Sequence, residues 1–244
     1  MFKVAIVAGY AEKTIKKCIC SLLQQTCKNW EVQVVIDPVG DNTYQNATCY
    51  SSSKIKITLN EKRQFALSNL VRAFKVLCPE DDDILVTIDG DDWLYSSCVF
   101  EILEKYYNAN KELLLTYGSW VGFPDSLCVT NNFAYTAKDF QNNIRKVNWR
   151  GTQLRTFKYK VWKYIKDEDF RDEYGKYFKS AWDLAIMWPM LEMAGYNRVQ
   201  FIPHTLYVNN QDGIHHDNKD RLKEQMYYTD YIAAKQQYTY RPNV

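Results

Sequence analysis

The chain has 244 residues, of which 46% are apolar, so it can bury the core of one large domain or of two small ones. Its formal net charge of +2 is too balanced to favour a function in nucleic-acid or membrane-surface binding. The seven cysteines include no Cys-x-x-Cys pair, which predicts reduced thiols in a cytoplasmic protein. The sequence shows no export leader and no apolar run of membrane-spanning length, so neither export nor a membrane span is expected.

Short apolar segments alternate with helical stripes along the first 90 residues. We expect strands over 3–8, 31–36, 54–59 and 84–88, with helices whose buried stripes lie within 15–23 and 66–77. This alternation predicts an α/β fold with a doubly wound, mostly parallel sheet and helices on both faces.

The second half of the chain is less regular. The sequence predicts a strand over 113–117, loops and short strands over 119–150, and a helix over 180–194 that Pro189 bends and Gly195 ends. Two short strands over 198–202 and 205–208 and a final helix over 217–238 follow. No linker-like stretch interrupts the chain, so a single domain over 1–244 is expected.

The most informative segment is the run of acids after the strand 84–88, namely Asp89-Gly90-Asp91-Asp92. Carboxylates held this close repel each other unless a cation occupies the site. Oxygen ligands suit Mg²⁺ or Mn²⁺, which are commonly held by one or two carboxylates together with substrate phosphate oxygens. The alternative is a polar turn that merely follows a buried strand.

Three segments lie at predicted carboxyl ends of strands: Gly9-Tyr10, Asp37 and the acids 89–92. Ligands bind at this edge of an open α/β sheet, so these side chains should converge. The chain has neither of the common glycine-rich phosphate loops, and a metal is therefore expected to hold the phosphates.

Seven motifs occur in order along the chain. Four lie in the first half: Ser21-Leu22-Leu23-Gln24-Gln25-Thr26, Asp37 with Asp41, Ala66-Leu67-Ser68-Asn69 and Ile88-Asp89-Gly90-Asp91-Asp92-Trp93. Three follow: Arg155-Thr156-Phe157-Lys158, Ala181-Trp182-Asp183-Leu184 and Leu191-Glu192-Met193-Ala194-Gly195. Taken together, the motifs resemble those of the inverting glycosyltransferases of family 2, which have the GT-A fold, and the resemblance covers about the first 120 residues. The later motifs resemble a narrower branch of bacteria and large algal viruses that includes capsid-glycan enzymes, with the host cytoplasm as location if the chain is viral.

The resemblance implies that residues 1–118 bind the nucleotide sugar and 119–244 bind the acceptor. It places Asp37 against the uracil edge of a UDP-sugar, with Tyr10 and Asn69 near the base. Asp89 and Asp91 would form the Asp-x-Asp motif, with Asp91 on the metal. Alternatively, Asp37 begins an Asx-turn, Tyr10 is a core ring and Asn69 satisfies backbone groups in its helix.

Asp183 lies where family 2 enzymes carry the catalytic base, although Trp182 replaces the acid that usually precedes it. The rival interpretation is a capping box in which Ser180 and Asp183 only close the start of a helix. Trp182 itself could stack on the acceptor sugar or pack in the core.

Cationic and imidazole side chains complete the implied site. Arg155 and Lys158 would neutralise the diphosphate, or else be solvated charges on a surface helix. His215 and His216 are candidate metal ligands, or else solvated loop residues.

The function implied is a metal-dependent transfer, with inversion, of one sugar from a UDP-sugar to a hydroxyl of a glycan or glycoconjugate. A single transfer is expected because the membrane spans and the Gln-x-x-Arg-Trp motif of processive synthases are absent from this sequence. Two alternatives remain: a haloacid-dehalogenase-like phosphohydrolase with Asp89 as nucleophile, and a sugar-nucleotide-binding module without catalysis.

Overall fold

The structure is a computed structural model that describes residues 1–125, 133–212 and 219–244. Its helices are α1 (Ile15–Leu23), α2 (Thr43–Thr48), α3 (Phe65–Leu77), α4 (Val99–Ala109), α5 (Ala137–Gln141), α6 (Tyr159–Trp162), α7 (Trp182–Ala194) and α8 (Lys219–Ala234), with short 3-10 turns at Ile144–Lys146, Asp167–Phe170 and Tyr196–Arg198. Its strands are β1 (Phe2–Ala8), β2 (Trp30–Ile36), β3 (Ile55–Leu59), β4 (Ile84–Asp89), β5 (Trp93–Leu94), β6 (Leu115–Phe123), β7 (Thr156–Lys158) and β8 (Val199–Asn210).

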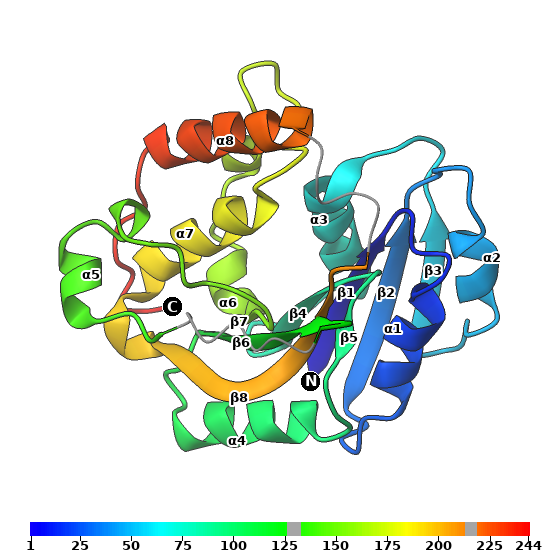
Figure 1. Cartoon of the computed structure of the whole chain (residues 1–244). Helices are drawn as coiled ribbons and strands as arrows, with labels where there is room; N and C mark the ends of the chain where they lie inside the picture. Colours follow the sequence, from blue (N-terminus) through cyan, green and yellow to red (C-terminus); the bar gives the residue numbers. More distant parts are fainter. Residues whose placement is uncertain (126–132, 213–218) are drawn as a thin grey trace.

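One sheet runs through the described part of the chain in the order β3-β2-β1-β4-β7-β6-β8-β5 (Figure 1). The strands β3, β2, β1 and β4 are all parallel, as the alternation of strands and helices predicted. Beyond β4 the sheet is mixed, because the short β7 lies antiparallel between β4 and β6. The predicted α/β class and helix-covered sheet are confirmed, with this antiparallel insertion as an addition.

Helices cover both faces of the sheet, as the burial of β1 on both sides shows. Its whole length is buried: Ala5 and Val7 pack in the core beneath α3 and α7, whereas Val4 and Ile6 pack in the core beneath α1 and α4. A strand buried on both faces is apolar along most of its length, which is the pattern that identified β1 and β4 in the sequence. The layers hold the carboxyl ends of β1, β2 and β4 at one edge (Figure 1).

Several elements differ from the sequence-based prediction, among them the short helices α2 and α5, which were not predicted. The two short strands expected over 198–202 and 205–208 are one strand, β8, which passes through Pro203. The exposed Pro203 lies where the register against β6 shifts between Ile202 and Thr205, so its missing N–H interrupts the pairing without ending the strand. Helix α4 was not predicted, although its buried side of Val99, Phe100, Leu103 and Tyr107 has helical spacing.

Among the helices that the structure describes, we find none with both the length and the apolar composition needed to cross a membrane.

Candidate active site

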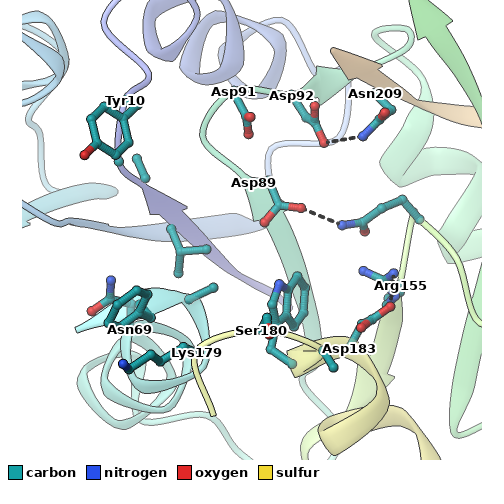
Figure 2. Close-up of a pocket in the computed structure, with 18 of the residues that line it drawn as sticks. Tyr10, Asn69, Asp89, Asp91, Asp92, Arg155, Lys179, Ser180, Asp183 and Asn209 are labelled. Carbon is teal, nitrogen blue, oxygen red and sulfur yellow. Dashed lines mark hydrogen bonds and ion pairs between the residues drawn. The ribbon is translucent and has the colours of Figure 1, made fainter. Parts of the chain in front are cut away.

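A cavity of about 480 Å³ lies at the edge where β1, β2 and β4 end. Its size is typical of small-molecule sites. Figure 2 shows Tyr10, Asn69 and Lys179 on one side in this view, Arg155 and Asp183 on the other, and Asp89 between them. The structure thus brings together seven residues that the sequence singled out: Tyr10, Asp37, Asn69, Asp89, Asp91, Arg155 and Asp183.

The acidic loop after β4 is pressed against the end of β1, and Gly90 makes this approach possible. A Cβ at Gly90 would lie 2.5 Å from the Cβ of Ala8 and 3.1 Å from its Cα. The Gly90 N–H donates to the Val7 carbonyl at 2.8 Å. Only glycine fits so close a backbone contact, which brings the acidic loop against the end of β1.

Asp92 anchors this loop to β8. It is only 2% exposed, and its carboxylate accepts the backbone N–H of Asn210 at 2.7 Å and the Asn209 side-chain amide at 3.3 Å. The Tyr207 hydroxyl accepts the backbone N–H of Asp89 at 3.1 Å. Burial, with the nearby charges of Asp89 and Asp91, raises the pKa of Asp92 well above its usual value. The third acid of the motif is therefore engaged by the protein itself.

Asp89 and Asp91 face the cavity with different surroundings. Burial, followed by the charge of Asp91, raises the pKa of Asp89 to about 7, although Arg155 and Gln153 act in the opposite direction. The Gln153 Nε2 donates to Asp89 Oδ2 at 3.1 Å (dashed in Figure 2). Asp91 is exposed and lines the same cavity. The pair is a site of negative charge that nearby cationic groups offset only in part.

The donor set of this loop fits a hard divalent cation. The Asp89 and Asp91 carboxylates repel each other, and this repulsion adds to burial in raising the pKa of Asp89. The repulsion falls when a cation lies between the two carboxylates. Within the described ranges, no cluster of three or more His, Cys, Asp or Glu side chains could hold a metal ion by itself. A cation here would need oxygens of a substrate to complete its shell, as is usual for Mg²⁺. The other predicted ligands, His215 and His216, lie outside the described residues.

Asp37, at the end of β2, is held by the loop that precedes α3. It is 5% exposed, and its carboxylate accepts the backbone N–H groups of Gln64 at 3.0 Å and Phe65 at 2.9 Å. The Asn60 Nδ2 donates both to Asp37 Oδ1 at 2.8 Å and to Asn69 Oδ1 at 2.7 Å. These partners belong to a different loop, so the Asx-turn considered for Asp37 does not account for its contacts. The network links two predicted base-binding residues through Asn60.

We expect Asp37→Ala to lower the free energy of unfolding by about 3 kcal/mol, because buried donors lose a charged acceptor. The melting temperature of the nucleotide-free protein should fall by roughly 6 to 12 °C in a thermal scan. Glu61→Ala, an exposed acid in the same loop, serves as the control and should change stability by less than about 0.5 kcal/mol. An unchanged melting temperature in Asp37→Ala would contradict this network.

Tyr10 is not a core ring. It is 47% exposed, has a left-handed backbone with φ of +58°, and lines the cavity. The guanidinium of Arg63 lies 5.4 Å from its ring centroid and 4.6 Å from that of Phe65. These side chains form an aromatic and cationic rim beside Asp37 and Asn69.

Asp183 lies in the first turn of α7, and the alternative interpretation of a capping box does not hold. The N-cap is Ala181, in a left-handed conformation with φ of +53°, and no side chain caps this end of the helix. The Ser180 hydroxyl has no hydrogen-bond partner within the described ranges. The Asp183 carboxylate instead accepts a bond from Arg155 Nη2 at 3.1 Å. It is therefore directed to the cavity rather than to the helix backbone.

Arg155 and Lys158 are not solvated charges of a surface helix. Arg155 directly precedes β7, is 6% exposed and lines the cavity. Lys158, at the other end of β7, pairs with Asp82 at 3.2 Å and does not line the cavity. Asp82 belongs to the acidic run before β4, so Lys158 lies at the opposite edge of the sheet, where a role at the diphosphate is not possible.

Gln153 and Asn60 could not be selected from the sequence. Gln153 is buried and contacts Asp89 across 64 positions of sequence, whereas Asn60 joins Asp37 to Asn69. Amide side chains near strand ends carry no periodic signal, so only the tertiary structure identifies them. The contacts of Asp92 with Asn209 and Asn210 were missed for the same reason.

Comparison with solved structures identifies the fold of the chain. The chain superposes on Staphylococcus aureus TarS in complex with UDP-GlcNAc (TM-score 0.63, 19% identity, 95% of this chain and 66% of the other). It also superposes on the mannosyltransferase PcManGT from Pyrobaculum calidifontis in complex with GDP-Man and Mn²⁺ (TM-score 0.63, 14% identity, 97% and 65%). The fold is therefore the GT-A fold of glycosyltransferases, as the resemblance implied.

At the level of sequence, the profile described as Glycosyl transferase family 2 matches residues 4–125. A curated relative is UDP-Glc:alpha-D-GlcNAc-diphosphoundecaprenol beta-1,3-glucosyltransferase WfgD of Escherichia coli, which is 33% identical over 93 residues. That match covers 38% of this chain and 36% of the relative, so the chain spans only part of its length. The chain belongs to glycosyl transferase family 2.

Proposed function

We propose that this protein transfers one sugar from a UDP-sugar to a hydroxyl group of a glycan or glycoconjugate, with inversion at the anomeric carbon. The observation that carries the proposal is the cavity itself. It combines the Asp89 and Asp91 carboxylates at the end of β4 with the Asp183 carboxylate at the start of α7 (Figure 2). Asp89 and Asp91 are suited to bind the cation of a diphosphate, and Asp183 is suited to accept a proton.

Uridine is the favoured base. The rim of Tyr10, Arg63 and Phe65 offers ring faces for stacking, and Asp37 retains acceptor capacity because a carboxylate has about four lone-pair sites and three are engaged. The relative from E. coli is named for UDP-Glc, and TarS is bound to UDP-GlcNAc. PcManGT binds GDP-Man, so the fold alone does not select the base.

A divalent cation, Mn²⁺ or Mg²⁺, would be held by Asp91 and Asp89 together with oxygens of the diphosphate, with His215 and His216 as further candidate ligands. When bound, the cation offsets negative charge on the diphosphate leaving group. Gln153 keeps Asp89 oriented towards the cavity through its bond to Oδ2. The Mn²⁺ in the PcManGT complex is consistent with this role.

Asp183 is the proposed general base, which removes the proton of the acceptor hydroxyl as that oxygen attacks the anomeric carbon. A single displacement of this kind inverts the configuration. Trp120, Trp149 and Trp182, all half-buried, also line the cavity and offer apolar faces for the ring of an acceptor sugar. We thus assign donor binding to residues 1–118 and acceptor binding to residues 119–244.

The phosphohydrolase alternative is not favoured. A nucleophilic carboxylate must be ionised and free to attack, whereas burial raises the pKa of Asp89 and Gln153 occupies one of its oxygens. Membership of glycosyl transferase family 2 argues in the same direction. Release of phosphate from simple phosphate esters would restore this alternative.

The test is a thermal-shift screen of nucleotide sugars with Mn²⁺ or Mg²⁺, followed by an assay of nucleotide release. The panel contains UDP-glucose, UDP-galactose, UDP-N-acetylglucosamine and GDP-mannose, and a ligand selective for the folded state raises the melting temperature. We expect a metal-dependent shift with a UDP-sugar and slow release of UDP without acceptor. Binding without any release would indicate a non-catalytic module, and no shift with any donor would contradict the proposal.

We also propose the cytoplasm as the place of action. The six cysteines in the described part of the chain are all free thiols, which suits a reducing compartment.

A further inference from the structure

Arg155 is fixed in the cavity by three contacts. Its Nε donates to the Gly151 carbonyl at 2.7 Å, its Nη2 donates to Asp183 Oδ2 at 3.1 Å, and its guanidinium lies 5.1 Å from the ring centroid of Trp182. Its side chain is only 8% exposed. An arginine held on a carbonyl, a ring face and a carboxylate has little freedom to reach another partner.

Asp183 depends on this arginine for its orientation. In the described ranges Arg155 is the one hydrogen-bond partner of the Asp183 carboxylate, and the start of α7 supplies no capping bond. The Asp183 side chain is 24% exposed, so it is only partly enclosed by its surroundings. Figure 2 shows the two side chains next to each other at one wall of the cavity.

The contact is made through one oxygen. Because Arg155 binds Oδ2, Oδ1 remains available to accept a proton from a group in the cavity. Proton transfer depends on such placement, since an error of about 1 Å costs on the order of 100-fold in rate. The Arg155 guanidinium, which binds Oδ2, can thus set the direction in which Oδ1 of Asp183 points.

We infer that Arg155 is a positioning residue for the general base Asp183, rather than a ligand of the diphosphate as the sequence suggested. This inference rests on the proposed function and names the residue that makes its base effective. It assigns the segment from Gly151 to Arg155 a double task, because Gln153 of the same segment orients Asp89. One short stretch before β7 therefore arranges the carboxylates on both sides of the reacting bond.

The test is a double-mutant cycle between Arg155→Met and Asp183→Asn, with turnover followed as UDP release from the UDP-sugar of the panel that gives the largest thermal shift. Binding of UDP with Mn²⁺ is measured by calorimetry. Arg150→Met is the matched control. Arg150 precedes Gly151, pairs with Asp139 at 3.0 Å and has its guanidinium 5.4 Å from the ring centroid of Tyr135, but it does not line the cavity.

We expect Arg155→Met to lower kcat by about 100-fold while the Kd for UDP stays within about twofold. In the Asp183→Asn background the same change should cost less than about threefold, since the two residues act as a unit. Added guanidinium should restore part of the turnover of Arg155→Met, which a purely structural role would not allow. Arg150→Met should keep normal kcat.

Three outcomes would overturn the inference. A Kd for UDP that rises by about tenfold or more would make Arg155 a diphosphate ligand. Losses that multiply in the cycle would show that Arg155 does not act through Asp183. Normal turnover of Arg155→Met would show that Arg155 has no role in the reaction.

If Arg155→Met does not fold, Arg155→Lys, which keeps the charge but not the planar fork, replaces it in the cycle. Full activity of Asp183→Asn alone would instead refute the proposed base.

Discussion

Replacing Asp183 by asparagine is expected to lower kcat by on the order of 10²- to 10⁴-fold, because the amide cannot take the acceptor proton. The change is nearly isosteric, and the Arg155 guanidinium can still donate to the amide oxygen, so the fold and the cavity should persist. The Kd for UDP with Mn²⁺ should stay unchanged, since the proposal assigns Asp183 to the acceptor and not to the donor. Steady-state kinetics and calorimetry on the same preparation measure both quantities.

Asp230→Asn is the matched control, because Asp230 is an exposed acid on α8 and does not line the cavity. It should retain normal kcat. Near-normal turnover of Asp183→Asn would remove Asp183 as the base, and a parallel loss of UDP binding would mean that the carboxylate serves the donor instead.

The second large effect is expected at Asp91. Asp91→Asn should abolish the dependence of UDP binding on Mn²⁺ and lower turnover by on the order of 10³-fold, since the cation is worth several kcal/mol of charge stabilisation. Asp91 is exposed at the cavity, and Gly90 rather than Asp91 makes the close packing against β1, so stability should change little. Calorimetric titration of UDP with and without Mn²⁺ separates the metal effect from the effect on the nucleotide.

Asp82→Asn provides the comparison, because Asp82 is an exposed acid in the run before β4, at the opposite edge of the sheet. It should bind UDP and Mn²⁺ as the unchanged protein does. If Asp91→Asn still binds UDP more tightly in the presence of Mn²⁺, the metal is held elsewhere, and His215 or His216 become the next residues to replace.

The parallel half of the sheet could be predicted because three of its four strands, β1, β2 and β4, are buried along most of their length. The apolar runs of β1 and β4 are typical of the middle of a helix-covered sheet, and their ends then define the ligand edge. This is why Asp37, Asp89 and Asp91 were found from sequence. The mixed half could not be derived in this way, because β7 has three residues and its position between β4 and β6 depends on tertiary pairing.

The site residues of the second half show the same limit. Arg155 and Lys158 are three positions apart, yet one lines the cavity and the other pairs with Asp82 at the opposite edge of the sheet. The sequence could not separate them, since the direction of each side chain is set by the strand between them. Likewise, Ser180 and Asp183 have the spacing of a capping box, but the left-handed Ala181 moves the helix start and releases the carboxylate.

The most direct measurement for the central claim is a crystal structure of the protein with UDP and Mn²⁺, in which anomalous scattering locates the metal. The account predicts a manganese peak in contact with Asp91, diphosphate oxygens on the same ion, and uracil beside Asp37 and Tyr10. A nucleotide bound away from the ends of β1, β2 and β4, or a manganese ion without a contact to the acidic loop, would contradict it.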